Sequence, residues 1–355
     1  MCHSNMQGVK QVKLTFKETR VNVERLLVMV SAALVVALHG NETAVSQYEE
    51  SRLTQGVSTV TLPTAPPAEM QPVTIYYQDG EGYLVPVTTQ VEKTDGIAKA
   101  ALSLLVESPA NDAAAARMGL KTCVPEGTSF DLDISDGRAR VDLGKDALTC
   151  ATAEQESLMV GSVAQTLAEF PTVKEVSFLF DGQTRSRLTH GTDVSGVFTA
   201  KDINMETVST FDGSDSNASL VKLFFPSQTG RMLVPVTRVV YSNADPVTAM
   251  VELCRGPKPD SGLEHSVPEG CGIRSVTMKN GVVSIDLTGE FNQAAENKTQ
   301  MLRAIQFTAS QFPGVKEVKL SVEGVPYAIP EEAKATWINL DTEVISYYPG
   351  VIEVD

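Results

Sequence analysis

The 355-residue chain has few of the side chains on which most catalytic sites depend: one tryptophan, four histidines and five cysteines. Positively charged residues are outnumbered by negatively charged ones: the chain has 29 Lys and Arg and 44 Asp and Glu, which gives a formal net charge of −15. Nucleic acids and anionic membrane surfaces are both bound through clustered Lys and Arg. From residue 26 onward we find no such cluster, so we expect no nucleic-acid partner and no electrostatic docking on lipid.

Long apolar segments are missing as well, apart from residues 26–38 (LLVMVSAALVVAL). A helix that spans a bilayer needs about 20 apolar residues, and this segment is shorter. It follows five Lys and Arg residues among the first 25, a pattern typical of a secretory signal. We therefore expect residues 1–40 to be an export signal or membrane anchor; a buried core helix is the alternative. The protein is then expected at the extracytoplasmic face of the cell membrane, anchored or secreted.

The polar, Pro-containing residues 41–71 show little apolar periodicity, which favours a flexible tether. Beyond it the chain is duplicated. The matched segments keep their order in both copies: LVPVT at 84–88 and 233–237, VPEG at 124–127 and 267–270, and FPxVKEV at 170–176 and 312–318. We predict two domains, residues 72–210 and 211–346, with a tail at 347–355. The Ile-Asn motif of residues 203–207 recurs at 338–342, and we expect the first of these segments to pack back on the first domain.

Each copy predicts the order β-β-α-β-β-α-β. Asp136-Gly137 and Asn280-Gly281 lie between alternating apolar residues, which indicates tight hairpin turns. Asp95 and Asp245 are the expected N-caps of the first helix in each copy. The fold class is α/β (α+β): two tandem units, each a mixed sheet with two helices packed on one face.

No combination of residues predicts a catalytic centre. His190 and His265 have no counterparts in the other copy, and a structural zinc site needs four ligands. The carboxylate pairs Asp131–Asp133 and Glu154–Glu156 could suit glycan hydrolysis, but strand alternation favours a solvated face for the first pair. We expect no catalytic, cofactor-binding or metal site and no cofactor, and hence a protein that is not an enzyme.

Asp142 and Asp286 occupy matched positions between apolar neighbours near the ends of the predicted hairpins. Capping of a turn is the expected structural role of these carboxylates. They are also our candidate partner-binding residues.

Four cysteines lie in the two units: Cys123 and Cys150 in the first, Cys254 and Cys271 in the second. Export makes disulfides possible. One bridge in each unit is the preferred interpretation, and buried free thiols are the alternative.

The ordered set of motifs resembles that of the GerM-domain family: a Val-Pro-Val-Thr strand, a Val-Pro-Glu-Gly turn, a Val/Ile-Asp-Leu strand and Phe-Pro-x-Val-Lys-Glu-Val, each present twice. The resemblance implies an envelope lipoprotein whose domains are similar to the ring-building modules of trans-envelope assemblies and which supports the complex between mother cell and forespore. Asn41 stands where the lipidated cysteine is expected, which puts the lipid anchor in doubt but not the export.

The expected function is therefore that of a non-enzymatic, envelope-tethered interaction protein in a sporulation or germination assembly. The expected partners are envelope or sporulation proteins with similar modules, with the membrane contacted only through the N-terminal segment. Residues 73–77 and 221–225 are candidate docking surfaces if they are edge strands. The alternative is an exported protein that binds or cleaves cell-wall glycan, for which Trp337 is the single tryptophan platform.

Overall fold

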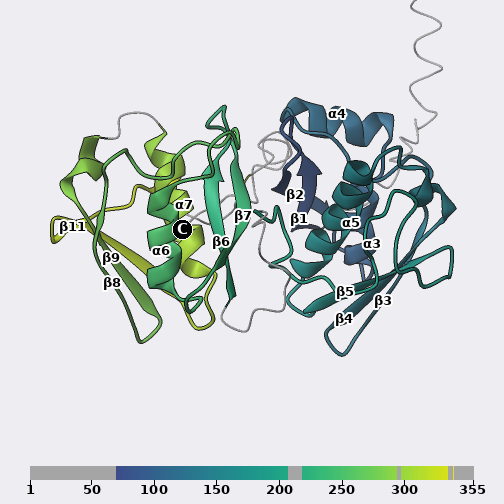
Figure 1. Ribbon diagram of the computed structural model, residues 1–355. Helices are drawn as coiled ribbons and strands as arrows, with labels where there is room; N and C mark the ends of the chain where they lie inside the picture. The colour runs from purple at the N-terminus through teal and green to yellow at the C-terminus, as the bar shows by residue number, and fades with distance from the viewer. Residues whose placement is uncertain (1–68, 207–217, 294–296, 335–338, 340–355) are drawn as a thin grey trace, which may run out of the picture. The chain divides into compact units, whose positions relative to one another are not determined.

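The computed structural model describes residues 69–206, 218–293, 297–334 and 339 of the chain. These residues form two consecutive repeats of similar elements (Figure 1). The predicted signal and tail lie outside the described residues, and so does the predicted tether up to residue 68. The last two residues assigned to the tether, Met70 and Gln71, instead begin the first strand. The first repeat consists of β1 (Met70–Gln78), β2 (Leu84–Glu92), α3 (Ile97–Ser103), α4 (Pro109–Arg117), β3 (Phe130–Ser135), β4 (Arg138–Leu143), η1 (Lys145–Thr149), α5 (Ala153–Ala168) and β5 (Glu175–Phe180).

The second repeat follows the same order without a counterpart of α4 and adds one short strand. Its elements are β6 (Ser219–Pro226), β7 (Leu233–Val240), α6 (Pro246–Arg255), β8 (Ile273–Lys279), β9 (Val282–Leu287), η2 (Gly289–Gln293), α7 (Lys298–Ser310), β10 (Glu317–Val322), β11 (Val325–Tyr327) and η3 (Glu331–Ala333).

The strands of each repeat divide between two sheets, where the sequence predicts one. β1 and β2 form an antiparallel hairpin, and β3-β4-β5 form a separate sheet in which β4 and β5 run parallel. The second repeat has the β6–β7 hairpin and the sheet β11-β10-β9-β8. Figure 1 shows α6 and α7 between this hairpin and this sheet. The arrangement follows from the broad apolar surfaces of the long helices, because a helix that is apolar on more than one side can pack against two sheets.

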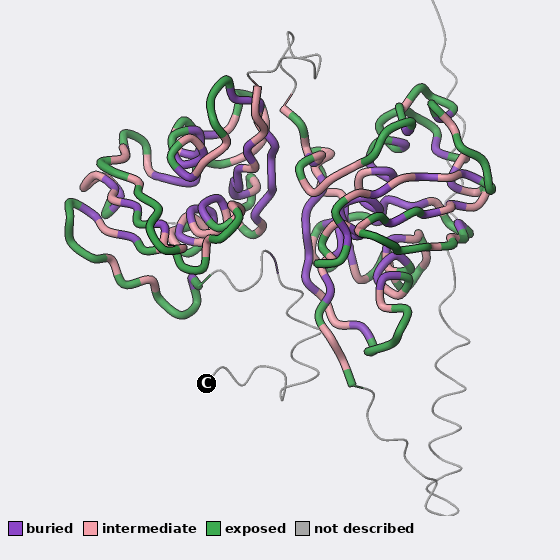
Figure 2. Tube along the Cα trace, turned by 90° about the horizontal axis from the view of Figure 1, so that it is seen from below, coloured by how far each residue is buried: buried purple, intermediate pink, exposed green. Residues whose placement is uncertain are grey.

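The core contains apolar faces of both long helices. Met159, Val163 and Leu167 on α5 are buried, as are Ile305 and Ala309 on α7. Figure 2 shows that buried residues follow the inner strands and helices while the exposed ones gather in the connections. Burial of these faces supplies the main stabilisation, at roughly 25 cal/mol per Å² of apolar surface removed from water.

The hairpin turns have the predicted geometry. Asp136 and Gly137 have φ values of 50° and 82°, and Asn280 and Gly281 have φ values of 52° and 82°. Two consecutive positive φ angles define the type I′ turn, which matches the twist of the flanking strands. These turns fix the register of the β3–β4 and β8–β9 hairpins.

One predicted helix cap is confirmed and one is wrong. The carboxylate of Asp245 accepts the Thr248 N–H at 2.8 Å and caps α6. Asp95 is not the N-cap of α3, because Gly96 holds that position. Pro109 is the first residue of α4, and the N-cap before it is Ser108, whose hydroxyl accepts the Asn111 N–H. Proline suits the first turn of a helix because its missing N–H has no partner there.

Within the part of the chain that the structure describes, every helix is too short or too polar to cross a bilayer.

Candidate interaction sites

The outer edge of β1 is closed by α5. This strand contains residues 73–77, one of the predicted docking segments. It pairs with β2 on one side, and at its end Gln78 forms an isolated bridge with Lys121 on the other. The Tyr76 N–H donates to Thr166 Oγ1 at 3.2 Å, and Ser162 Oγ donates to the Tyr76 carbonyl at 2.6 Å. The backbone groups at the middle of this edge are therefore already bound by helix side chains.

The second repeat closes β6 in the same way. The Phe224 N–H donates to Thr308 Oγ1 at 3.3 Å, and the Phe224 carbonyl accepts Ser266 Oγ at 2.7 Å. Gln311 exchanges two hydrogen bonds with the backbone of Lys222. Residues 73–77 and 221–225 are thus edge strands, but the expectation that they offer open docking edges is wrong. The intrinsic strand pattern gave no sign that polar helix residues would cap them.

Asn204 binds the outer edge of β2. Its side chain accepts the Leu84 N–H at 2.9 Å and donates to the Leu84 carbonyl at 2.8 Å. The same amide nitrogen donates to the carbonyl of Pro235 on β7 at 2.7 Å. One side chain therefore links matched strands of the two repeats.

Asn339 makes the equivalent contacts from the other side. It accepts the Leu233 N–H and donates to the Leu233 carbonyl, both at 2.8 Å, and it donates to the Pro86 carbonyl at 2.8 Å. Pro86 and Pro235 have no N–H to offer, which is common on sheet edges. The two asparagines thus bind the β2 and β7 edges reciprocally. The recurrence of Ile-Asn after each repeat is the sequence signal for these paired asparagine contacts. The buried Ile203 packs with Tyr76 and Leu84, as expected for a segment that packs back on the first repeat.

Asp142 and Asp286 both cap turns. Asp142 Oδ1 accepts the Gly182 N–H at 3.0 Å, and Asp286 Oδ1 accepts the Gly324 N–H at 2.9 Å. In each case the turn follows the neighbouring parallel strand. Asp286 also accepts the Ser321 hydroxyl and lies 3.2 Å from Arg274 Nη1. The Gly324 N–H, the Ser321 hydroxyl and the Arg274 charge together lower the pKa of Asp286. Partner binding by this pair stays a prediction.

Glu156 and the two histidines have structural contacts within their own repeats. Buried Glu156 accepts the N–H groups of His190 and Thr192, and His190 Nε2 lies 2.8 Å from the Cys150 carbonyl. These contacts hold the connection after β5 against α5. His265 packs over Gly256, where an added Cβ would meet the imidazole ring.

Asp131 and Asp133 are exposed on β3, as predicted, and Asp131 forms an ion pair with Lys99 at 2.8 Å. No group of three potential metal ligands lies together among the described residues. Trp337 lies outside them.

The four cysteines that the structure describes carry free thiols, three of them buried. Burial raises the pKa of Cys123 to about 12, and burial together with the neighbouring Cys271 raises the pKa of Cys254 to about 12. Thiols with such values are almost entirely protonated at neutral pH and are poor nucleophiles. The two disulfides stay a prediction.

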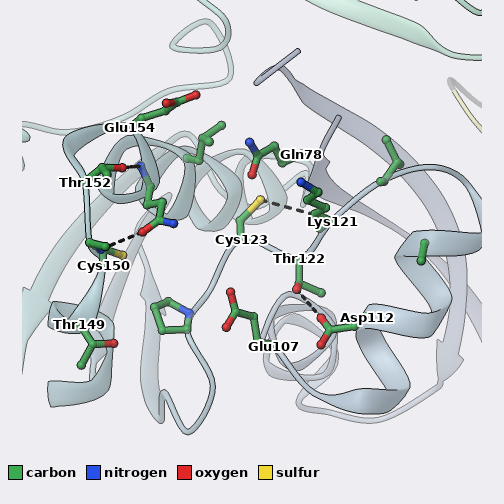
Figure 3. Close-up of a pocket in the computed structure, with 16 residues that line it drawn as sticks. Gln78, Glu107, Asp112, Lys121, Thr122, Cys123, Thr149, Cys150, Thr152 and Glu154 are labelled. Carbon is green, nitrogen blue, oxygen red and sulfur yellow. Dashed lines mark hydrogen bonds between the residues drawn. The ribbon is translucent and has the colours of Figure 1, made fainter. Parts of the chain in front are cut away.

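A cleft of about 780 Å³ opens in the first repeat between α4, residues 120–125 and the start of α5. Figure 3 shows Glu107, Cys123 and Thr122 lining it, with Asp112 accepting the Thr122 hydroxyl at 2.6 Å. Because α4 has no counterpart in the second repeat, the cleft belongs to one repeat only.

The comparisons with known proteins agree with this duplicated architecture. The model of the Germane family, described as sporulation and spore germination, matches residues 74–186 and 222–328. The spore germination protein GerM of Bacillus subtilis (strain 168) is 29% identical over 272 residues, which cover 73% of this chain and 74% of that protein. The solved structure of the tandem GerMN domains of the sporulation protein GerM from Bacillus subtilis superimposes with a TM-score of 0.64 at 26% identity, covering 77% of this chain and 99% of that one. The family model matches more than half of the chain, once in each repeat, and the chain therefore belongs to the Germane family of sporulation and spore germination proteins.

Proposed function

We propose that the protein is a non-enzymatic, envelope-tethered interaction protein that contributes to an assembly between mother cell and forespore during sporulation. Membership of a sporulation and germination family in both repeats carries this proposal. The use of the candidate polar residues supports it: Asp142, Asp286 and Glu156 each bind backbone groups of their own repeat. The N-terminal segment would place both repeats outside the cytoplasm.

The yield of heat-resistant spores tests this role. The gene is deleted in its host and complemented either with the full chain or with residues 1–212. A large loss of heat-resistant spores that only the full chain restores would support a role that needs both repeats. An unchanged yield after deletion would refute the proposed role.

Pelleting with peptidoglycan separates this function from the glycan alternative. The full chain is incubated with purified cell-wall sacculi, and the supernatant is analysed for released fragments. An interaction protein of the proposed kind releases no fragments and stays in the supernatant. Soluble glycan products would overturn the non-enzymatic assignment.

A further inference from the structure

Most sheet edges in the described part of the chain are covered from within. β1 and β6 are capped by helix side chains, and β2 and β7 by the two asparagines. β5 is covered by Phe198, which exchanges two hydrogen bonds with Val176, and β10 by the three-residue strand β11. The long edges that remain are those of β3 and β8, which border the larger sheet of each repeat. They occupy matched positions.

The two remaining edges differ in charge. β3 (FDLDIS) carries Asp131 and Asp133 and no cation, whereas β8 (IRSVTMK) carries Arg274 and Lys279 and no anion. Each strand also has an exposed apolar side chain next to its last residue, since Ile134 is 37% and Met278 is 41% exposed. Uncovered strand edges bind other strands through their backbone groups, and opposite charges facing each other favour one pairing over others.

We propose that β3 of one copy of this chain pairs with β8 of a second copy. The inference deepens the proposed interaction function and rests on it, by naming a surface and a partner. Because each copy carries both strands, the contact is head-to-tail and can continue from copy to copy.

The hairpin registers fix how such a pair aligns. The two residues that flank a two-residue turn form backbone hydrogen bonds with each other, and along the strand every second residue does the same. The N–H groups of the residues between them, including Leu132 and Met278, point away from the hairpin partner. An antiparallel pair with Leu132 opposite Met278 brings Asp131 opposite Lys279 on the solvent face. On the other face, the same register places Ile134 opposite Val276. In this register apolar side chains lie opposite apolar side chains, and the carboxylate of Asp131 lies opposite the ammonium group of Lys279. Both kinds of cross-strand pair stabilise a sheet.

Two existing contacts of Asp131 must be exchanged when the strands pair. The Leu132 N–H donates to the carboxylate of its neighbour Asp131 at 3.0 Å, and this group would turn to the incoming strand. Asp131 is highly exposed and its ion pair with Lys99 is a surface contact, so the carboxylate can exchange partners readily.

Carbodiimide crosslinking tests the pairing directly, because it joins a carboxylate and an amine that are in contact. Full-length chain in mild detergent is prepared as an equal mixture of unlabelled and ¹⁵N-labelled protein. We expect a crosslink between Asp131 and Lys279 in which the two peptides carry different isotopes. A crosslink found only within one isotope, or its absence in a self-associated sample, would overturn the proposal.

The second experiment exchanges the charges at positions 131 and 279 and measures self-association by sedimentation at low salt. D131K and K279D should each weaken self-association at least tenfold, and the double variant should restore it to within about threefold. E331K is the matched control, since it also reverses an exposed acid that pairs with a lysine, and it should change nothing. Failure of the double variant to recover, or equal loss in E331K, would refute the pairing. Crosslinking without a sporulation defect on gene deletion would refute the proposed function while leaving the pairing intact.

Discussion

Arg238 on β7 and Glu206, which follows the first repeat, form a two-point ion pair. Arg238 Nε lies 2.6 Å from Glu206 Oε2, and Nη2 lies 2.8 Å from Oε1. The guanidinium also reaches Glu252 on α6 at 3.2 Å. Burial acts to lower the pKa of Arg238, but the hydrogen bonds and charges of Glu206 and Glu252 outweigh it and raise that pKa. The pair therefore ties the connecting segment to the second repeat.

Replacing Glu206 by Gln keeps the shape of the side chain and removes its charge. Because hydrogen bonds to charged groups contribute about 1.5–3 kcal/mol, we expect the free energy of unfolding to fall by about that amount. Urea denaturation of wild type and variant provides the measurement. Glu69→Gln is the control, since it disrupts an exposed pair with Lys93 and should cost about 0–1 kcal/mol. Equal effects of the two changes would contradict the structural role of Glu206.

Replacing Asn204 should lower stability more than replacing Glu206. In Asn204→Asp the acceptor for the Leu84 N–H stays, but the donor to the carbonyls of Leu84 and Pro235 is lost. Each carbonyl left without its donor costs about 1–3 kcal/mol, so Asn204→Asp should destabilise the protein more than Glu206→Gln does. Thermal unfolding followed by circular dichroism gives the comparison. Asn243→Asp, at an exposed position, serves as the control and should leave the midpoint of unfolding unchanged. A similar shift of the midpoint in Asn204→Asp and Asn243→Asp would refute the role of Asn204 in linking the two repeats.

The elements of the fold were predictable because they depend on local signals. The I′ turns follow from Asp136-Gly137 and Asn280-Gly281, and α6 from Asp245-Pro246, all within a few residues. The division of each repeat into two sheets was not predictable, because it depends on which strands lie beside each other after folding. The covered edges were missed for the same reason: Thr166 and Tyr76 are 90 residues apart in sequence.

Closure of the hairpin edges by hydroxyl groups can be tested with isosteric variants. Thr166→Val and Thr308→Val each leave a buried N–H, that of Tyr76 or Phe224, without its acceptor. We expect each to lower the free energy of unfolding by about 1–3 kcal/mol, with similar values because the positions are equivalent. Hydrogen exchange measured by NMR should become faster at the Tyr76 amide in Thr166→Val and at the Phe224 amide in Thr308→Val, by similar factors. Unchanged protection would show that the hydroxyls do not hold these edges, and the exposed Thr94→Val controls for the loss of a hydroxyl.

The cysteine state was left open by the sequence because pairing depends on distance, and free thiols give a sharp expectation. With pKa values of about 12, Cys123 and Cys254 are thiolates in only ~1 in 10⁴ molecules at pH 8. We expect iodoacetamide to leave both unmodified in the folded protein and to modify both in denaturant without reductant, as read by peptide mass spectrometry. Protection that persists in denaturant until reductant is added would instead establish the predicted disulfides.

The lowered pKa of Asp286 predicts an acid-dependent contribution to stability. The Gly324 N–H, the Ser321 hydroxyl and Arg274 favour its ionised form in the folded protein, whereas the unfolded carboxyl has a pKa of about 3.9. Stabilisation by Asp286 is therefore complete above that value and is lost as pH falls through the lower folded pKa. The midpoint of thermal unfolding of Asp286→Asn should lie below that of wild type at pH 6, and the difference should shrink toward pH 2.5. Asp133→Asn, which removes a carboxylate at an exposed position on β3, is the matched control and should leave the midpoint at pH 6 close to that of wild type. A difference that stays constant from pH 6 to 2.5 would mean that the ionised form of Asp286 does not stabilise the turn after β10.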